Sequence, residues 1–141
     1  MTFQKITIAA TVKAGLSTAW DCYTNPHYIT QWNFADDTWH CPTAQNDLKV
    51  GGKLCSRMEA KDGSFGFDFE ATYETVEKEK KLVYRLDDGR EVCTTFETKP
   101  EGVEVTTTFD AETQNSLEMQ KDGWQAILNN YKKCAEGAKA S

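Results

Sequence analysis

Residues 65–74 read FGFDFEATYE, and they alternate between apolar and polar side chains with a period of two. One face of such a strand carries the aromatic and alanine side chains: Phe65, Phe67, Phe69, Ala71 and Tyr73. The other face carries glycine, threonine and acidic residues. A clean alternation of this kind is typical of an antiparallel strand with one buried and one solvated face.

Strands are predicted on both sides of this segment. Upstream, Gly51-Gly52 introduces a strand that runs to about Ala60, and residues 61–64 form a hairpin turn because Asp-Gly is a strong short turn signal. Downstream, alternation predicts strands over residues 82–86, 92–98 and 103–109, with turns between them. The middle of the chain therefore reads as an antiparallel meander.

The first third of the chain mixes strand and helix signals. Residues 3–13 alternate as a half-buried strand, and residues 16–24 have helical spacing that ends at Asn25-Pro26, because a residue before proline avoids the helical region. Pro26 suits the first turn of a short second helix to about Trp32. We expect a strand over residues 37–41 that Pro42 closes, followed by a loop over residues 43–47.

After Asp110 the apolar period changes from two to about 3.6 residues, which predicts a long C-terminal helix. Asn115 is the expected N-cap, with Glu118 three residues later, and Gln120 falls off the apolar stripe. The stripe consists of Leu117, Trp124, Leu128, Tyr131 and Ala135. A lone helix with a broad apolar stripe must bury it against the sheet.

The predicted fold class is therefore α+β: a single domain over residues 1–141, with a curved antiparallel sheet of six or seven strands around the C-terminal helix. Two short helices follow the first strand, which can pair with the last. A chain of 141 residues is long enough to bury such a core.

Composition restricts the classes of function. The net charge of −6 argues against electrostatic binding to nucleic acid or an anionic membrane. No apolar run approaches the length of a membrane helix, and the N-terminal residues lack a secretory signal pattern, so we expect a cytoplasmic protein. Five cysteines without C-x-x-C spacing are expected to be free buried thiols rather than a disulfide framework or a metal site.

Three pieces of the sequence resemble a known family when taken together. They are Ala19-Trp20-Asp21 with Asn25-Pro26 and Gln31-Trp32, then residues 47–53 with Met58 and Asp62-Gly63, and finally Gly123-Trp124 with Leu128. In this order, the chain resembles the START-like (SRPBCC) superfamily. Within it, the chain looks like the branch related to the C-terminal domain of the activator of the 90-kDa heat-shock chaperone ATPase.

This resemblance implies a helix-grip fold, in which the long helix closes one side of the sheet and leaves a cavity. Relatives use that cavity for lipids, sterols, polyketides or other apolar molecules, whereas some are cyclases or hydrolases and some assist a chaperone. The fold alone does not choose among these functions.

Large apolar side chains are the candidate ligand-binding residues, and each also has an ordinary role in the core. They are Trp32, Trp39, Met58, Phe67, Phe69, Tyr84, Phe96, Trp124 and Leu128. No catalytic residue, metal ligand or cofactor is predicted. His40 and Cys41 are adjacent on the expected strand, so their side chains point to opposite faces. Arg57 and Arg85 are expected in surface ion pairs.

The leading hypothesis is that the protein binds a small apolar or amphipathic ligand without evident catalysis. The alternative is an interaction module with a chaperone partner, which should expose an apolar patch. A cyclase or hydrolase is a third possibility; it needs a polar pair inside the cavity, for which the inward-facing Thr94 and Thr107 give slight support.

Overall fold

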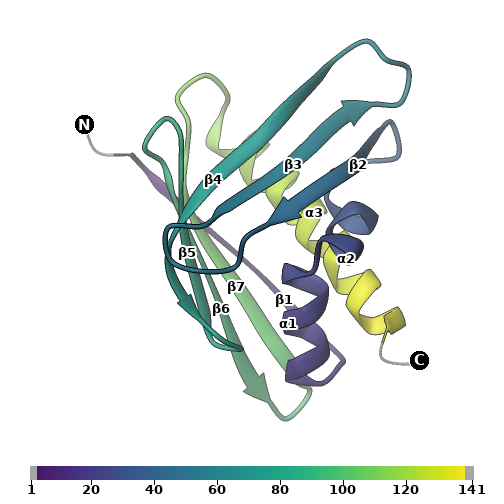
Figure 1. Ribbon diagram of the computed structural model, residues 1–141, viewed down its shortest axis with the longest axis vertical. Helices are drawn as coiled ribbons and strands as arrows, with labels where there is room; N and C mark the ends of the chain where they lie inside the picture. Colours follow the sequence, from purple (N-terminus) through teal and green to yellow (C-terminus); the bar gives the residue numbers. More distant parts are fainter. Residues whose placement is uncertain (1–2, 139–141) are drawn as a thin grey trace.

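The computed structural model of the protein describes residues 3–138 and consists of a seven-stranded antiparallel sheet with three helices (Figure 1). The strands are β1 (Lys5–Val12), β2 (Trp39–Asn46), β3 (Lys53–Ala60), β4 (Gly66–Glu77), β5 (Lys81–Leu86), β6 (Glu91–Lys99) and β7 (Gly102–Asp110). The helices are α1 (Leu16–Thr24), α2 (Pro26–Trp32) and α3 (Leu117–Ala138). The sheet curls into a half-barrel whose hollow side faces α3, so the predicted helix-grip α+β fold is confirmed.

The strand order is β1-β7-β6-β5-β4-β3-β2, so the first strand pairs with the last as predicted. Lys5 lies opposite Asp110 in the β1–β7 register, and its Nζ is 2.7 Å from Asp110 Oδ1. The backbone N–H of Glu91 also donates to Asp110, at 2.9 Å. Burial acts to raise the pKa of the Asp110 carboxyl, but the bonds from Lys5 and Glu91 outweigh it, and the pKa is lowered.

The glycine pair before β3 is required by the close approach of the preceding loop. Gly51 has a φ of +82°, and a Cβ placed on Gly52 would lie 2.1 Å from the carbonyl oxygen of Asp47. Gly51 N–H donates to Tyr73 O, and Tyr73 N–H donates to Gly52 O, each at 2.9 Å. The glycines thereby attach the β2–β3 turn to β4.

Strand β2 differs from its prediction, since it continues through Pro42 and the expected loop to Asn46. It is the edge strand of the sheet, where a residue without an N–H is tolerated. Its register with β3 also shifts between His40 and Thr43, as it does at a β-bulge. The bulge absorbs the proline, and pairing resumes at Thr43 opposite Arg57.

Helices α1 and α2 form as predicted around Asn25-Pro26. Asn25 N–H closes α1 on Asp21 O at 2.8 Å, and its side-chain oxygen accepts the N–H of His27 at 3.0 Å. One residue therefore ends the first helix and caps the second. The indole Nε1 of Trp32 donates to Cys22 O at 2.8 Å, which fixes the angle between the two helices.

The start of α3 corrects the predicted cap and stripe. The N-cap is Ser116, whose Oγ accepts the N–H of Met119 at 3.1 Å, rather than Asn115. Leu117 is 45% exposed and leaves the apolar stripe, whereas Gln120 is buried. The Gln120 amide donates to Glu112 O and Asn115 O and accepts the N–H of Glu112. The first turn is therefore held by a buried amide that binds the incoming loop.

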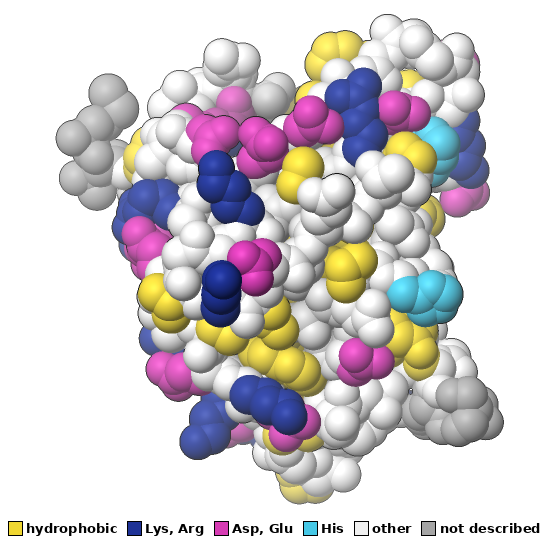
Figure 2. Space-filling model, viewed as in Figure 1, with side chains coloured by type: hydrophobic (Ala, Val, Ile, Leu, Met, Phe, Trp, Pro, Cys, Tyr) yellow, Lys and Arg dark blue, Asp and Glu magenta, His cyan; other side chains and the backbone are white. Residues whose placement is uncertain are grey.

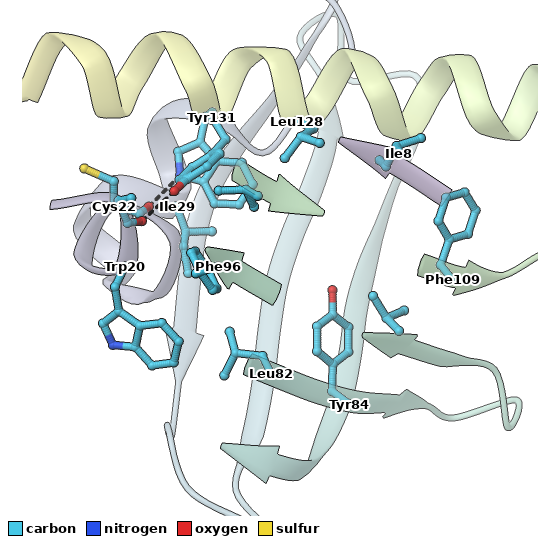
Figure 3. Packing of buried hydrophobic residues seen from close by; sticks show 14 of the residues in the cluster. Ile8, Trp20, Cys22, Ile29, Leu82, Tyr84, Phe96, Phe109, Leu128 and Tyr131 are labelled. Carbon is cyan, nitrogen blue, oxygen red and sulfur yellow. Dashed lines mark hydrogen bonds between the residues drawn. The ribbon is translucent and has the colours of Figure 1, made fainter. Parts of the chain in front are cut away.

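The rest of the helical stripe packs into the hollow of the sheet (Figure 3). Leu128, Tyr131 and Ala135 are buried, and the Tyr131 hydroxyl donates to Ala19 O at 2.6 Å. Tyr131 also packs edge-on against Tyr23, with ring centroids 5.1 Å apart. This end of the molecule is a solid core shared by α1, α3 and β6.

All five cysteines are free, but only Cys22 and Cys41 are buried; Cys55, Cys93 and Cys134 are half-buried, which differs from the expectation of buried thiols. Among residues 3–138, no helix has the length and apolarity needed to cross a membrane.

Candidate functional site

A largely apolar cavity of about 210 Å³ lies between α3 and the β3–β5 half of the sheet. Its walls come from α1, α2, α3 and five strands. The lining residues are Ile8, Tyr23, Ile29, Trp32, Asn33, Leu54, Ser56, Met58, Phe67, Phe69, Tyr73, Tyr84, Thr107, Trp124, Ile127 and Leu128. An engineered apolar cavity of about 150 Å³ in another protein holds benzene, so this space suits a molecule of one or two rings.

The structure places most of the sequence-predicted site residues around this cavity. Those that line it are Trp32, Met58, Phe67, Phe69, Tyr84, Trp124 and Leu128. Strand alternation brings Leu54, Ser56 and Met58 of β3 to the hollow face, beside Phe67 and Phe69 of β4. Phe67 is 41% exposed, so it stands where the cavity meets solvent.

Two predicted site residues lie elsewhere. Phe96 is buried under α1, with its ring centroid 5.2 Å from that of Trp20 and 5.4 Å from that of Tyr23. Trp39 lies outside the cavity lining and contacts Phe65 and Phe67, with centroids 6.0 and 6.1 Å away. Phe65 is 61% exposed, because the β3–β4 hairpin extends beyond α3 (Figure 1). Trp39, Phe65 and Phe67 form an aromatic cluster at this end of the sheet.

Trp124 forms one end wall of the cavity. Its indole stacks on Phe109 of β7, with centroids 4.0 Å apart and an interplanar angle of 9°. Its edge meets Phe69, whose centroid is 6.4 Å away. The Trp124 side chain is thus clamped between both halves of the sheet. Leu128 follows four residues later, on the same face of the helix, and also lines the cavity.

A chain of hydroxyl groups from α1, β6 and β7 adjoins the cavity. The Tyr23 hydroxyl is 3.1 Å from Thr94 Oγ1, which is 2.9 Å from Thr107 Oγ1. Tyr84 adds a fourth hydroxyl, directed from β5 toward α3 (Figure 3). Burial raises the pKa values of Tyr23 and Tyr84, so both phenols stay protonated at neutral pH.

Ser56 adds a hydroxyl on the opposite wall. Among the buried side-chain nitrogen and oxygen atoms of residues 3–138, only Ser56 Oγ lacks a hydrogen-bond partner. The Cys41 thiol lies close enough to Ser56 to have its pKa affected by the hydroxyl. It does not satisfy Ser56, because the thiol donates to Thr43 O at 3.4 Å and its sulfur is a weak acceptor. Burial, the largest effect, raises the pKa of Cys41, so this pair is uncharged.

Charged side chains lie outside the cavity lining. Arg57 pairs with Glu59 at 2.8 Å, and Arg85 pairs with Glu74 at 2.7 Å, as predicted for surface ion pairs. Acidic and basic side chains are interspersed on the face shown in Figure 2. His40 is 3.6 Å from Glu59 at the surface, whereas Cys41 is buried. Among residues 3–138, no three His, Cys, Asp or Glu side chains converge as a metal site would require.

Sequence reasoning missed several lining residues. Ile8, Tyr73 and Thr107 lie in predicted strands, but strand periodicity does not distinguish core from cavity wall. Tyr23 lies in the predicted helix over residues 16–24, where helical spacing has the same limit. The sequence did contain a signal for the polar part of the cavity wall, because threonine recurs at inward positions of β6 and β7. These residues, Thr94 and Thr107, lie opposite each other in the β6–β7 register.

Comparison with known proteins identifies the family of the chain. The sequence pattern of the family described as Activator of Hsp90 ATPase homolog 1-like protein matches residues 13–136. Among proteins with curated descriptions, none matches this sequence.

Solved structures extend the likeness to the whole fold. An AHSA1-like protein from Aeromonas hydrophila is 42% identical, with 98% of this chain and 96% of that chain covered and a TM-score of 0.91. A protein of Cytophaga hutchinsonii is 40% identical, with coverage of 95% and 93% and a TM-score of 0.82. A Nitrosomonas europaea protein at 15% identity, with 97% of each chain covered and a TM-score of 0.83, shares the fold. The chain therefore belongs to the Activator of Hsp90 ATPase homolog 1-like family, a branch of the START-like superfamily.

Proposed function

We propose that the protein binds a small apolar or amphipathic molecule in the cavity between α3 and the sheet. The observation that carries the proposal is the cavity itself, about 210 Å³ and lined mainly by aromatic and aliphatic side chains. Protein interiors ordinarily fill such space with side chains. A preformed apolar pocket with a few polar groups is typical of a ligand site.

The test uses an uncharged fluorescent probe with two rings, 1-naphthylamine, and a variant that fills the cavity. Leu54 lines the cavity, so Leu54→Phe should weaken probe binding at least about tenfold through lost space. Leu117→Phe makes the same change at an exposed site on α3 and should bind as the unmodified protein does. Equal binding by both variants, or none by the unmodified protein, would overturn the proposal.

Native mass spectrometry of the protein purified from cells, followed by organic extraction, identifies the natural ligand class. A co-purifying apolar species that Leu54→Phe loses and Leu117→Phe retains supports carriage in this cavity. We also propose a cytoplasmic location, because five free thiols suit a reducing compartment.

A second candidate function is contact with the 90-kDa heat-shock chaperone, favoured by the exposed cluster of Trp39, Phe65 and Phe67 and by the family's description. Exposed aromatic residues are common anchors of protein interfaces. The purified protein should then raise the chaperone's ATPase rate, and Phe65→Ser should abolish the effect. Val50→Ser, at an exposed site on the β2–β3 turn, is the control. An ATPase rate that the unmodified protein leaves unchanged would exclude this function.

A further inference from the structure

Most polar side chains of the cavity lining carry a hydroxyl group. They are Tyr23, Ser56, Tyr73, Tyr84 and Thr107; Asn33 adds an amide, and no lining residue carries a charge. Each hydroxyl has one hydrogen to donate, so the hydrogens used in bonds between hydroxyl groups can be counted.

One hydroxyl hydrogen of the Tyr23–Thr94–Thr107 chain is not used by the bonds within it. Tyr23, Thr94 and Thr107 have three hydroxyl hydrogens, and two hydrogen bonds link them. If buried Thr94 donates to one neighbour and accepts from the other, the spare O–H belongs to Tyr23 or Thr107, which both line the cavity.

Tyr84 brings a further hydroxyl to the same cavity lining. The two hydrogen bonds that link Tyr23, Thr94 and Thr107 do not use the hydroxyl hydrogen of Tyr84. That hydroxyl points across the hollow toward Leu128 and α3 (Figure 3). A donor in this position needs an acceptor from the occupant of the cavity.

The acceptor has to be uncharged. An ionised carboxylate moved from water into this space would meet hydroxyl groups but no lysine, arginine or histidine among the lining residues. The surroundings of Ser56 offer no compensating charge either, because its neighbour, Cys41, is a neutral thiol.

We infer that the cavity binds an uncharged molecule with an apolar one- or two-ring body and a carbonyl-type oxygen acceptor, which accepts a hydrogen bond from the Tyr84 hydroxyl. This inference rests on the proposed function, since it names the class of ligand that the same cavity takes. It sets the cavity apart from sites that hold fatty acids or other anions through a cation.

The experiment compares three ligands of similar shape: naphthalene, 2-acetylnaphthalene and 2-naphthoate, each competing with the two-ring probe 1-naphthylamine at pH 7. The ketone should bind about five- to tenfold more tightly than naphthalene, as one hydrogen bond provides. Naphthoate should bind more weakly than either. Equal binding of ketone and naphthalene, or tightest binding of naphthoate, overturns the inference while leaving the cavity a ligand site. If naphthalene and ketone both fail to compete, the proposed function itself fails.

The variant Tyr84→Phe removes the hydroxyl and keeps the ring. The ratio of ketone to naphthalene affinity should fall to about one in this variant. In Tyr28→Phe, which loses a hydroxyl outside the cavity lining, the ratio should stay as in the unmodified protein. A ratio that Tyr84→Phe leaves unchanged overturns the assignment of the donor. The comparison in the unmodified protein tests the ligand class even if Tyr84→Phe does not fold.

Discussion

The indole of Trp124 lies flat on the phenyl ring of Phe109, with ring centroids 4.0 Å apart and planes inclined by 9°. This stack joins α3 to β7 at one end of the cavity, while the edge of the same indole contacts Phe69 of β4. The helix is therefore held against both sides of the curved sheet by one side chain. Stacked aromatic pairs contribute about 0.5–1.5 kcal/mol beyond the burial of their area.

Truncation of this clamp should destabilise the protein. We expect Trp124→Ala to lower the free energy of unfolding by about 2–4 kcal/mol, somewhat less than for a fully buried tryptophan because Trp124 is half-buried. Urea unfolding followed by circular dichroism measures the change. Trp124→Phe should recover much of it by restoring a ring on Phe109. A loss within about 0.5 kcal/mol, as at an ordinary surface site, would contradict the stacking.

The buried hydroxyl of Tyr131 gives a second prediction. It donates to Ala19 O at 2.6 Å and so links α3 to α1. Tyr131→Phe should lower stability by about 1 kcal/mol or more, because the bond is lost inside the core. Tyr28→Phe is the matched control, since the Tyr28 side chain is half-exposed. Chemical denaturation of the two variants side by side makes the comparison, and equal effects would argue against the bond.

Ser56 and Thr94 both carry buried hydroxyl groups, but removal of the hydroxyl should affect stability differently at the two positions. Thr94→Val breaks hydrogen bonds to Tyr23 and Thr107 and should cost about 1–2 kcal/mol. Ser56→Ala removes an oxygen that lacks a partner, so stability should stay level or rise. Thermal and urea unfolding report both changes. A clear loss in Ser56→Ala would show that this hydroxyl has a bonding partner in solution.

The pairing of Lys5 with Asp110 predicts a dependence of stability on pH. The folded-state pKa of Asp110 is lowered, so the folded protein binds fewer protons there than the unfolded chain does. Its contribution, about 1–2 kcal/mol, should be complete above the unfolded pKa of about 4 and be lost as pH falls through the folded pKa.

Urea unfolding of the unmodified protein and Asp110→Asn at a series of pH values from 7 to 3 checks this. The stability difference between the two proteins should be largest near pH 7 and shrink below pH 4. Asp122→Asn, at an exposed carboxylate of α3, should show no such trend. A difference that grows as pH falls would reverse the sign and refute the prediction.

The sequence was sufficient to predict the strand–helix order, because alternation in β4 and helical spacing in α3 are strong signals. It did not predict the length of β2. Proline usually marks the end of a strand, but an edge strand with a bulge can continue through one, as β2 does at Pro42. The sequence misplaced the start of α3 because Asn115 and Ser116 are both good capping residues, and only the loop geometry selects Ser116.

For the candidate site, periodicity identified which side chains point inward but not how far the helix covers them. Phe65, Phe67 and Phe69 share one face of β4, but their surroundings change from solvent to the cavity over two strand repeats, because α3 ends its cover partway along the hairpin. Phe96 and Tyr84 both point inward, and only tertiary packing sends one under α1 and the other into the cavity.

The cavity is built from Ile8, near the start of the described chain, and from Trp124 and Leu128, near its end. During synthesis on the ribosome, the sheet can begin to pair before residues 117–138 have been made, but the hollow then lacks its lid. Contacts between such distant segments form late because closing a long loop costs entropy. A ligand that binds here would therefore select chains in which residues 117–138 have been made and packed on the sheet, and its presence in the cell would bias newly made protein toward that folded structure.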